Sequence, residues 1–148
     1  MTYDKVPWHG WVLVCDGSKA LIIVNDGDPD LPNFRLIEAH CQPIPPAREL
    51  GDDRPGRSYQ SVGNARSSID QVDHHQAAER EFLTGIAARM DQLAQDNPIK
   101  SLTLVAPPKA LGLLRECLSP LTQARVTGEL NRDLTHLPLD EIGRHLKQ

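Results

Sequence analysis

The chain has no apolar run near the roughly 20 residues that a membrane-spanning helix needs, so the sequence predicts no membrane span and no membrane partner. It also has no excess of positive charge. A formal net charge of −4 over 148 residues gives no bulk attraction to nucleic acid or an anionic membrane, although a local basic loop could still bind either. Residues 1–5 are polar, and the apolar run at 11–15 is too short for the core of a signal peptide. We therefore expect a cytoplasmic protein.

Cysteine is scarce as well, which argues against a fold held by disulfides. Cys15, Cys41 and Cys117 are odd in number, and no pair has the C-x-x-C spacing of a zinc site. Cys15 and Cys41 fall in short apolar runs that are typical of strands. We expect reduced, buried thiols, with no metal ion and no cofactor.

Short β-rich runs separated by turn residues occupy the first 41 residues. The runs at 11–15 and 20–24 are joined by Asp-Gly-Ser at 16–18, which predicts an antiparallel hairpin. A third strand is predicted at 34–40. Alternation along this strand places Phe34, Leu36 and Glu38 on one face and Arg35, Ile37 and Ala39 on the other.

Helical patterns alternate with strands in the second half of the chain. A helix is predicted from near Asp73 to the Asn-Pro pair at 97–98. Its apolar face holds Ala77, Phe82, Leu83, Ile86, Met90 and Leu93. A strand at 101–105 then passes into a helix at 108–117, with Leu111, Leu114 and Leu118 on the face toward the sheet.

A short strand near 125–127 and a helix beginning at Pro138 complete the predicted order. Three strands, a long loop, and then alternating helices and strands predict one α/β domain over residues 1–148. We expect a mixed sheet with an antiparallel N-terminal hairpin and covering helices, in the order of the ribonuclease-H-like architecture.

The segment at 43–70 is the best candidate for function because it has no apolar periodicity and is unusually long for a loop. Its arginines could contact phosphates, with a serine, a tyrosine and a glutamine adding hydrogen bonds or stacking. These residues are Arg48, Arg54, Arg57, Arg66, Ser58, Tyr59 and Gln60. The alternative is that nearby carboxylates neutralise the arginines within the protein. Those carboxylates are Glu49, Asp52, Asp53 and Asp70.

Asp16 is a second candidate for a functional residue, as a metal ligand. Ribonuclease-H-type nucleases need several carboxylates that converge on divalent metal ions. Asp16 stands at the end of the first strand, where such a ligand would belong, and Glu79 or Glu81 could supply a second. The end of the fourth strand reads Ala-Pro-Pro at 106–108, however, and holds no carboxylate. We favour the interpretation that Asp16 begins the hairpin turn, with a hydrolase as the alternative.

Two further patterns have a structural and a functional interpretation. The Asp-His-His run at 73–75 resembles a phosphoesterase signature, but we expect it to cap and flank the helix rather than to bind a metal. Lys109 stands where an anion could bind at a helix N-terminus. Because Pro107 and Pro108 lack the N–H that such a site uses, we favour a structural role for the prolines. No residue is predicted to be catalytic.

Three segments carry a resemblance to a known family. They are Gly-Asp-Asp-Arg-Pro-Gly-Arg-Ser at 51–58, Leu-Val-Ala-Pro-Pro-Lys-Ala-Leu-Gly-Leu-Leu-Arg at 104–115 and Asp-Leu-Thr-His-Leu-Pro at 133–138. Together with the hairpin at 11–24 they resemble the host attachment proteins, and the match covers nearly the whole chain.

That family is regarded as similar to the middle domain of archaeal and eukaryotic peptide-release factors. The resemblance therefore implies a link to translation, with the ribosome or another RNA as partner. Release factors act through a Gly-Gly-Gln, whereas this chain has Gly-Arg-Ser-Tyr-Gln at 56–60 and no Gly-Gly-Gln. We expect a non-enzymatic cytosolic binding module, with a release-factor-like hydrolase and a surface attachment factor as the alternatives.

Overall fold

The computed structural model describes residues 5–42 and 64–147, with 64–75 and 147 described by their backbone alone. Five strands form one sheet in the order β3-β2-β1-β4-β5. The strands are β1 (Trp11–Cys15), β2 (Lys19–Asn25), β3 (Phe34–Cys41), β4 (Leu102–Val105) and β5 (Val126–Leu130). β1 pairs antiparallel with β2, β2 antiparallel with β3, and β4 lies parallel to both β1 and β5. The predicted mixed sheet with an antiparallel N-terminal hairpin is confirmed.

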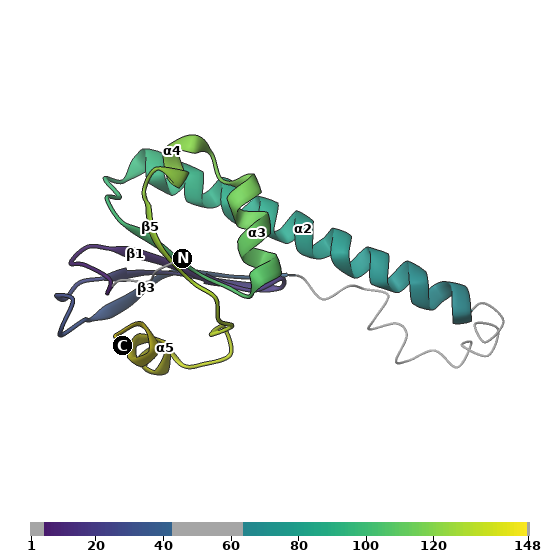
Figure 1. Ribbon diagram of the computed structural model, residues 1–148, viewed down its shortest axis with the longest axis horizontal. Helices are drawn as coiled ribbons and strands as arrows, with labels where there is room; N and C mark the ends of the chain where they lie inside the picture. Colours follow the sequence, from purple (N-terminus) through teal and green to yellow (C-terminus); the bar gives the residue numbers. More distant parts are fainter. Residues whose placement is uncertain (1–4, 43–63, 148) are drawn as a thin grey trace.

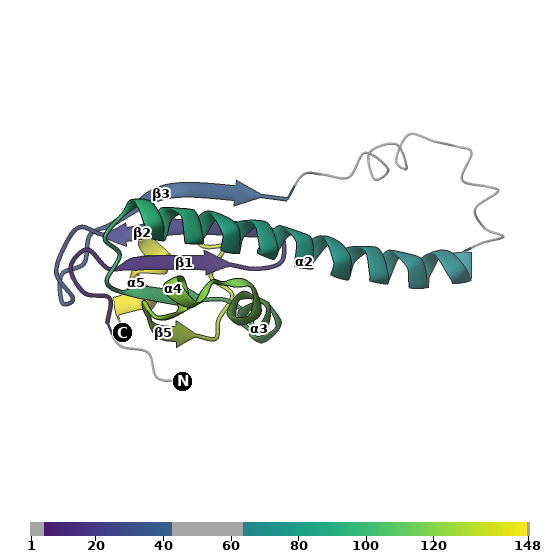
Figure 2. The same cartoon turned by 90° about the horizontal axis from the view of Figure 1, so that it is seen from above.

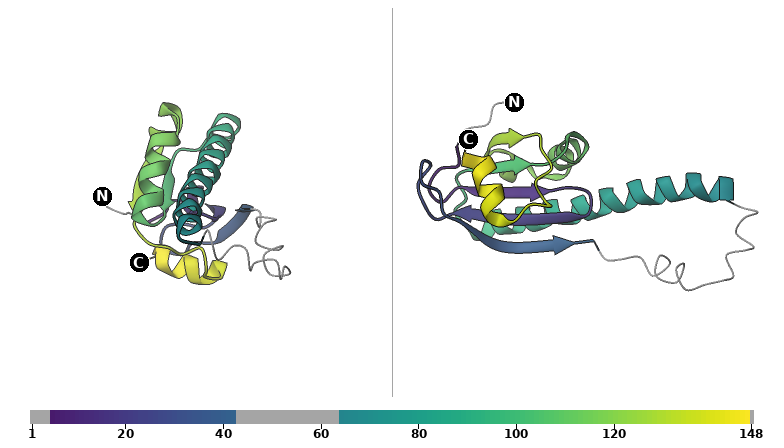
Figure 3. Two further views of the ribbon diagram at one scale, coloured as in Figure 1. Left: turned by 90° about the vertical axis from the view of Figure 1, so that its right-hand side faces the viewer. Right: turned by 90° about the horizontal axis from the view of Figure 1, so that it is seen from below.

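Helices cover both faces of this sheet (Figure 1). The long helix α2 (Asn64–Asp96), α3 (Pro108–Cys117) and the single turn α4 (Pro120–Gln123) lie on one face. The C-terminal helix α5 (Leu139–Lys147) lies on the other, as the end-on view in Figure 3 shows. The sheet is therefore the middle of three layers.

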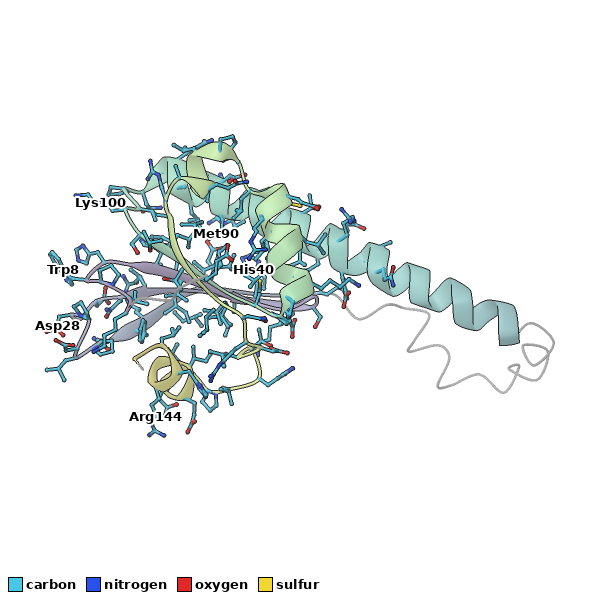
Figure 4. All side chains as sticks on the ribbon, viewed as in Figure 1. Trp8, Asp28, His40, Met90, Lys100 and Arg144 are labelled. Carbon is cyan, nitrogen blue, oxygen red and sulfur yellow. The ribbon has the colours of Figure 1, made fainter. Side chains whose placement is uncertain are left out.

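Both faces of the hairpin are buried, which explains why β1 and β2 are apolar at almost every position. Alternate side chains such as Leu13 and Ile22 pack toward α2 and α3, where Met90 of α2 points into the same cluster (Figure 4). The side chains between them, such as Val12 and Ile23, pack toward α5. Two clusters on opposite faces of one hairpin thus form the core.

The strand and helix predicted around the double proline are confirmed. Pro108 occupies the first turn of α3, where its missing N–H is no loss. Leu111, Leu114 and Leu118 are buried, with exposed fractions of 3%, 0% and 3%. The turn α4 was not predicted, because a single helical turn shows no periodicity. It is held to α2 by Asp91, which accepts hydrogen bonds from the Ser119 and Thr122 side chains at 3.0 and 2.6 Å.

The predicted boundary between the long loop and the first helix is wrong. α2 begins at Asn64 rather than near Asp73, so the last quarter of the predicted 43–70 loop is helical. Residues 64–84 contain no glycine or proline, and a helix can run through such residues without an apolar face to bury. Periodicity marks only the part of the helix that packs. Ala77, predicted on the apolar face, is accordingly exposed.

The predicted alternation along β3 is also wrong. A register shift opposite Ile22 and Ile23 places an extra residue, Ile37, between the paired Leu36 and Glu38. Such a bulge reverses the inward and outward faces beyond it. Phe34 therefore packs toward α5, whereas Glu38 reaches Arg89 on α2 across the opposite face.

The three cysteines are free, as predicted, but only Cys15 is buried. Burial, followed by the charges of Asp16 and Asp133, raises the pKa of Cys15 to about 12. Cys41 is exposed, contrary to the prediction, because it is the last residue of the edge strand β3. Cys117 is partly exposed at the end of α3.

Candidate functional site at the carboxyl edge of the sheet

The parallel strands β1, β4 and β5 end at the same edge of the sheet, and the connections that leave them meet there. Ligand sites in open α/β sheets form at this carboxyl edge. Asp16 follows β1, and the loop at 131–138 follows β5. We call Asp16, Asp133, Thr135 and His136 the carboxyl-edge cluster.

Asp16 has the turn role that the sequence predicts. Its Oδ1 accepts hydrogen bonds from the backbone N–H groups of Ser18 and Lys19, both at 2.8 Å. Its second oxygen, Oδ2, accepts a hydrogen bond from the Thr135 hydroxyl at 2.8 Å, 119 residues along the chain. Burial alone would raise the pKa of Asp16, but the hydrogen bonds from Ser18, Thr135 and Lys19 outweigh it, so the pKa lies below its usual value.

The loop after β5 brings three more polar side chains to Asp16. Thr135 is fully buried, and its hydroxyl also lies 2.8 Å from Asp133 Oδ1. His136 Nε2 lies 3.8 Å from Asp16 Oδ2 and 3.6 Å from Asp133 Oδ2. The His136 side chain is 76% exposed, whereas that of Asp16 is only 13% exposed. The imidazole of His136 is therefore exposed to solvent and lies beside both carboxylates.

Lys109 and Glu79 lie beside the same turn. Lys109 Nζ lies 3.6 Å from Glu79 Oε1, and both side chains are largely exposed. Glu79 reaches down from α2 onto Gly17, where a Cβ would come within 2.5 Å of Glu79 Oε2. Lys109, which the sequence predicts as a binding residue, therefore lies near the Asp16 turn and forms an ion pair with Glu79.

The other predicted binding residues are not placed. Arg54, Arg57, Ser58, Tyr59 and Gln60 lie outside the described residues. The side chains of the Asp-His-His run at 73–75 are outside them as well. Glu81, the other carboxylate considered with Asp16, is exposed on α2.

Sequence reasoning missed the partners of Asp16. His136 has no informative spacing to the other histidines, and Asp133 is 117 residues away from Asp16. The information that could have identified these partners lies in the order and direction of the strands. A polar run Asp-Leu-Thr-His that follows a strand parallel to β1 must emerge at the same edge as Asp16.

Two carboxylates and an imidazole at this separation can exchange protons or hold a cation. The arrangement also fixes the hairpin to the β5–α5 connection, so it stabilises the fold whatever its chemistry.

The described residues define a single mixed α/β domain with a five-stranded sheet, four helices and a polar cluster at the carboxyl edge of its parallel strands. The chain belongs to the family described as proteins required for attachment to host cells, whose sequence model matches residues 11–146. No curated protein matches the chain. Among residues 5–42 and 64–147, no helix is both long and apolar enough to cross a membrane.

Proposed function

We propose that the protein is a non-enzymatic binding module of the cytoplasm that contacts the ribosome or another RNA-containing partner through residues 43–66. The observation that carries this proposal is the length of α2. The helix extends well beyond the sheet, and no other described element lies alongside its first turns (Figure 2).

Burial along α2 supports this interpretation. A helix of 33 residues is about 50 Å long, which is far more than the sheet beneath it needs. Within the part whose side chains are described, burial begins at Leu83, and residues 76–81 are exposed or partly exposed. Helices gain most of their stability from packing, so a stretch that no other described element covers supports a role in contacting a partner. Asn64, where residues 43–63 rejoin the helix, lies at the far end of that stretch.

The charges of the described residues support the same assignment. Carboxylates hold many of the arginines outside 43–66, among them Arg89 with Glu38 and Arg115 with Glu129. Arg144 also pairs with a carboxylate, Glu141, on the outer side of α5. The sequence places four arginines at positions 48, 54, 57 and 66. Guanidinium groups bind phosphates through charge-assisted hydrogen bonds, and Tyr59 offers a ring for stacking on a base.

Co-sedimentation with ribosomes from the cell that encodes the protein tests this proposal. At low salt we expect the purified chain to move with ribosomes, and we expect rising salt to release it, because phosphate contacts exchange for counterions. Pretreatment with ribonuclease should abolish the association. Absence of the protein from the ribosomal fractions at low salt, and from RNA in a gel-shift assay, would contradict the proposal.

The carboxyl-edge cluster favours a hydrolase as the second candidate function, since Asp16 and His136 could act as acid and base. Incubation with Mg²⁺ or Mn²⁺ and either RNA or peptidyl-tRNA would show turnover that is lost in Asp16→Asn. Surface attachment, which the family description suggests, predicts the protein outside the cytoplasm. Cell fractionation separates that alternative from the binding module.

A further inference from the structure

The carboxyl-edge cluster holds three potential metal ligands whose donor atoms point toward one another. Asp16, Asp133 and His136 each offer an atom, and these atoms all lie within 4.8 Å of one another. Two carboxylate oxygens and one ring nitrogen form a mixed donor set from connections at opposite ends of the chain. The sheet topology, rather than local sequence, brings them together.

The separations are close to those of a bound ion. Ligands at about 2.1 Å from a metal are about 3.0 Å apart in an octahedral site and about 3.4 Å apart in a tetrahedral one. The His136 nitrogen lies 3.6 and 3.8 Å from the two carboxylate oxygens. These two separations exceed the tetrahedral value by a few tenths of an ångström, and the three donor atoms all lie within 4.8 Å of one another.

No lysine or arginine in the described part of the chain forms an ion pair with Asp16 or Asp133. Among the described residues, the ion-pair partner of both Asp16 and Asp133 is His136. The two carboxylates also share the single hydroxyl proton of Thr135, which can donate to only one of them at a time. A divalent cation would satisfy both carboxylates at once.

The ligands are also held in place. Three hydrogen bonds from Ser18 and Lys19 fix Asp16 Oδ1, and Oδ2, which accepts a hydrogen bond from Thr135, lies 3.8 Å from His136 Nε2. The hydroxyl of buried Thr135 lies within hydrogen-bond distance of the carboxylates of both Asp16 and Asp133, and so orients them. Outer hydrogen bonds of this kind are typical of metal sites, where they set the direction of each ligand.

We propose that Asp16, Asp133 and His136 bind a divalent first-row metal ion of the Mn²⁺–Zn²⁺ class, with water in the remaining positions. Imidazole together with carboxylate favours these ions over Ca²⁺ and Mg²⁺, which prefer oxygen ligands alone. The site does not depend on residues 43–66, so it holds whether or not the RNA-binding proposal does.

Mn²⁺ titration of the chelator-stripped full chain, followed by the electron paramagnetic resonance signal of free Mn²⁺, tests the site. We expect one bound ion per chain, displaced by Zn²⁺ but not by Mg²⁺. The double variant Asp133→Asn/His136→Gln should weaken binding about tenfold or more. The control Asp96→Asn/His145→Gln makes the same chemical changes away from the cluster and should bind as the wild type does.

Folding is checked by melting temperature before each titration. Should the double variant be destabilised, His136→Gln alone replaces it, because that side chain is 76% exposed. Equal Mn²⁺ affinity in the wild type and the variant would overturn the proposal. Absence of binding up to about 1 mM Mn²⁺ would overturn it as well.

Discussion

At the scale of single residues, the carboxyl group of Glu38 has a pKa far below its usual value, and the structure shows the cause. Hydrogen bonds from Arg89, and then from His40, lower the pKa of Glu38 from 4.5 to about 2. Arg89 donates hydrogen bonds to this carboxylate from two of its nitrogens, and so connects α2 to β3. A lowered pKa means that the charged form is favoured in the folded state, so the pair stabilises the protein above the unfolded pKa and ceases to do so as the pH falls toward 2.

We therefore expect Glu38→Gln to cost about 1 kcal/mol at pH 7, a value typical of a partly exposed, bidentate pair. Urea unfolding of the variant and the wild type at pH 7 and at pH 2.5 checks this. The difference between them should shrink at the lower pH, where most of the linkage has been lost. An equal difference at both values would show that the charge of Glu38 contributes nothing.

Two glycines at tight turns offer a second test at this scale. A Cβ at Gly27 would lie 2.8 Å from the backbone nitrogen of Asn33 and even closer to the Leu31 carbonyl oxygen. A Cβ at Gly17 would instead meet the flexible side chain of Glu79, at 2.5 Å from its Oε2. Backbone atoms cannot move aside, whereas a glutamate on the surface can.

Gly27→Ala should therefore cost about 1–3 kcal/mol, and Gly17→Ala should cost less than that. Equilibrium denaturation of both variants measures the two values. A larger loss for Gly17→Ala would mean that the contact between Glu79 and the Asp16 turn is rigid.

At the scale of elements, α3 shows how a local pattern determines packing. Leu114 is fully buried among the side chains that fill the space between α3, α2 and the sheet. Leu114→Ala should cost about 2–5 kcal/mol, because the cavity cannot collapse between two rigid layers. Leu121→Ala on α4, where the side chain is 45% exposed, is the matched control. A loss below about 0.5 kcal/mol at Leu114 would contradict the packing of α3.

Elements that bury a complete face could be predicted from the sequence. The hairpin of β1 and β2 and the helix after Pro108 have patterns that follow directly from their surroundings. The start of α2 could not be predicted in this way, since exposed turns leave no apolar period. The bulge at Ile37 was hidden as well, because a strand on the edge of a sheet tolerates a shift of register.

Only part of the candidate site could be predicted from the sequence. The turn role of Asp16 is local and was predicted from Asp-Gly-Ser alone. Its meeting with Asp133 and His136 depends on the parallel pairing of β1, β4 and β5, which no short sequence window contains. Residues that the strand order brings together can be recognised as a site only once that order is known.

At the scale of the whole molecule, the protein has a three-layered domain at one end and a long helix that leaves it. Carboxylates of the domain pair with several of its arginines, such as Arg89 and Arg115, whereas the sequence concentrates four arginines at 48–66. A division of this kind is typical of a module in which one part provides stability and the other contacts a partner. The carboxyl-edge cluster lies on the domain, at the end of its parallel strands.

The double variant Arg54→Ala/Arg57→Ala tests the proposed contact between residues 43–66 and the partner. Melting temperature and ribosome co-sedimentation are measured on the same preparation, with Arg35→Ala/Arg144→Ala as the control that removes two exposed arginines away from α2. We predict an almost unchanged melting temperature and a marked loss of co-sedimentation, since exposed ion pairs contribute only about 0–1 kcal/mol. A stability loss of about 3–5 kcal/mol with binding retained would contradict the account. The arginines would then form a structural latch with carboxylates such as Asp52, Asp53 or Asp133.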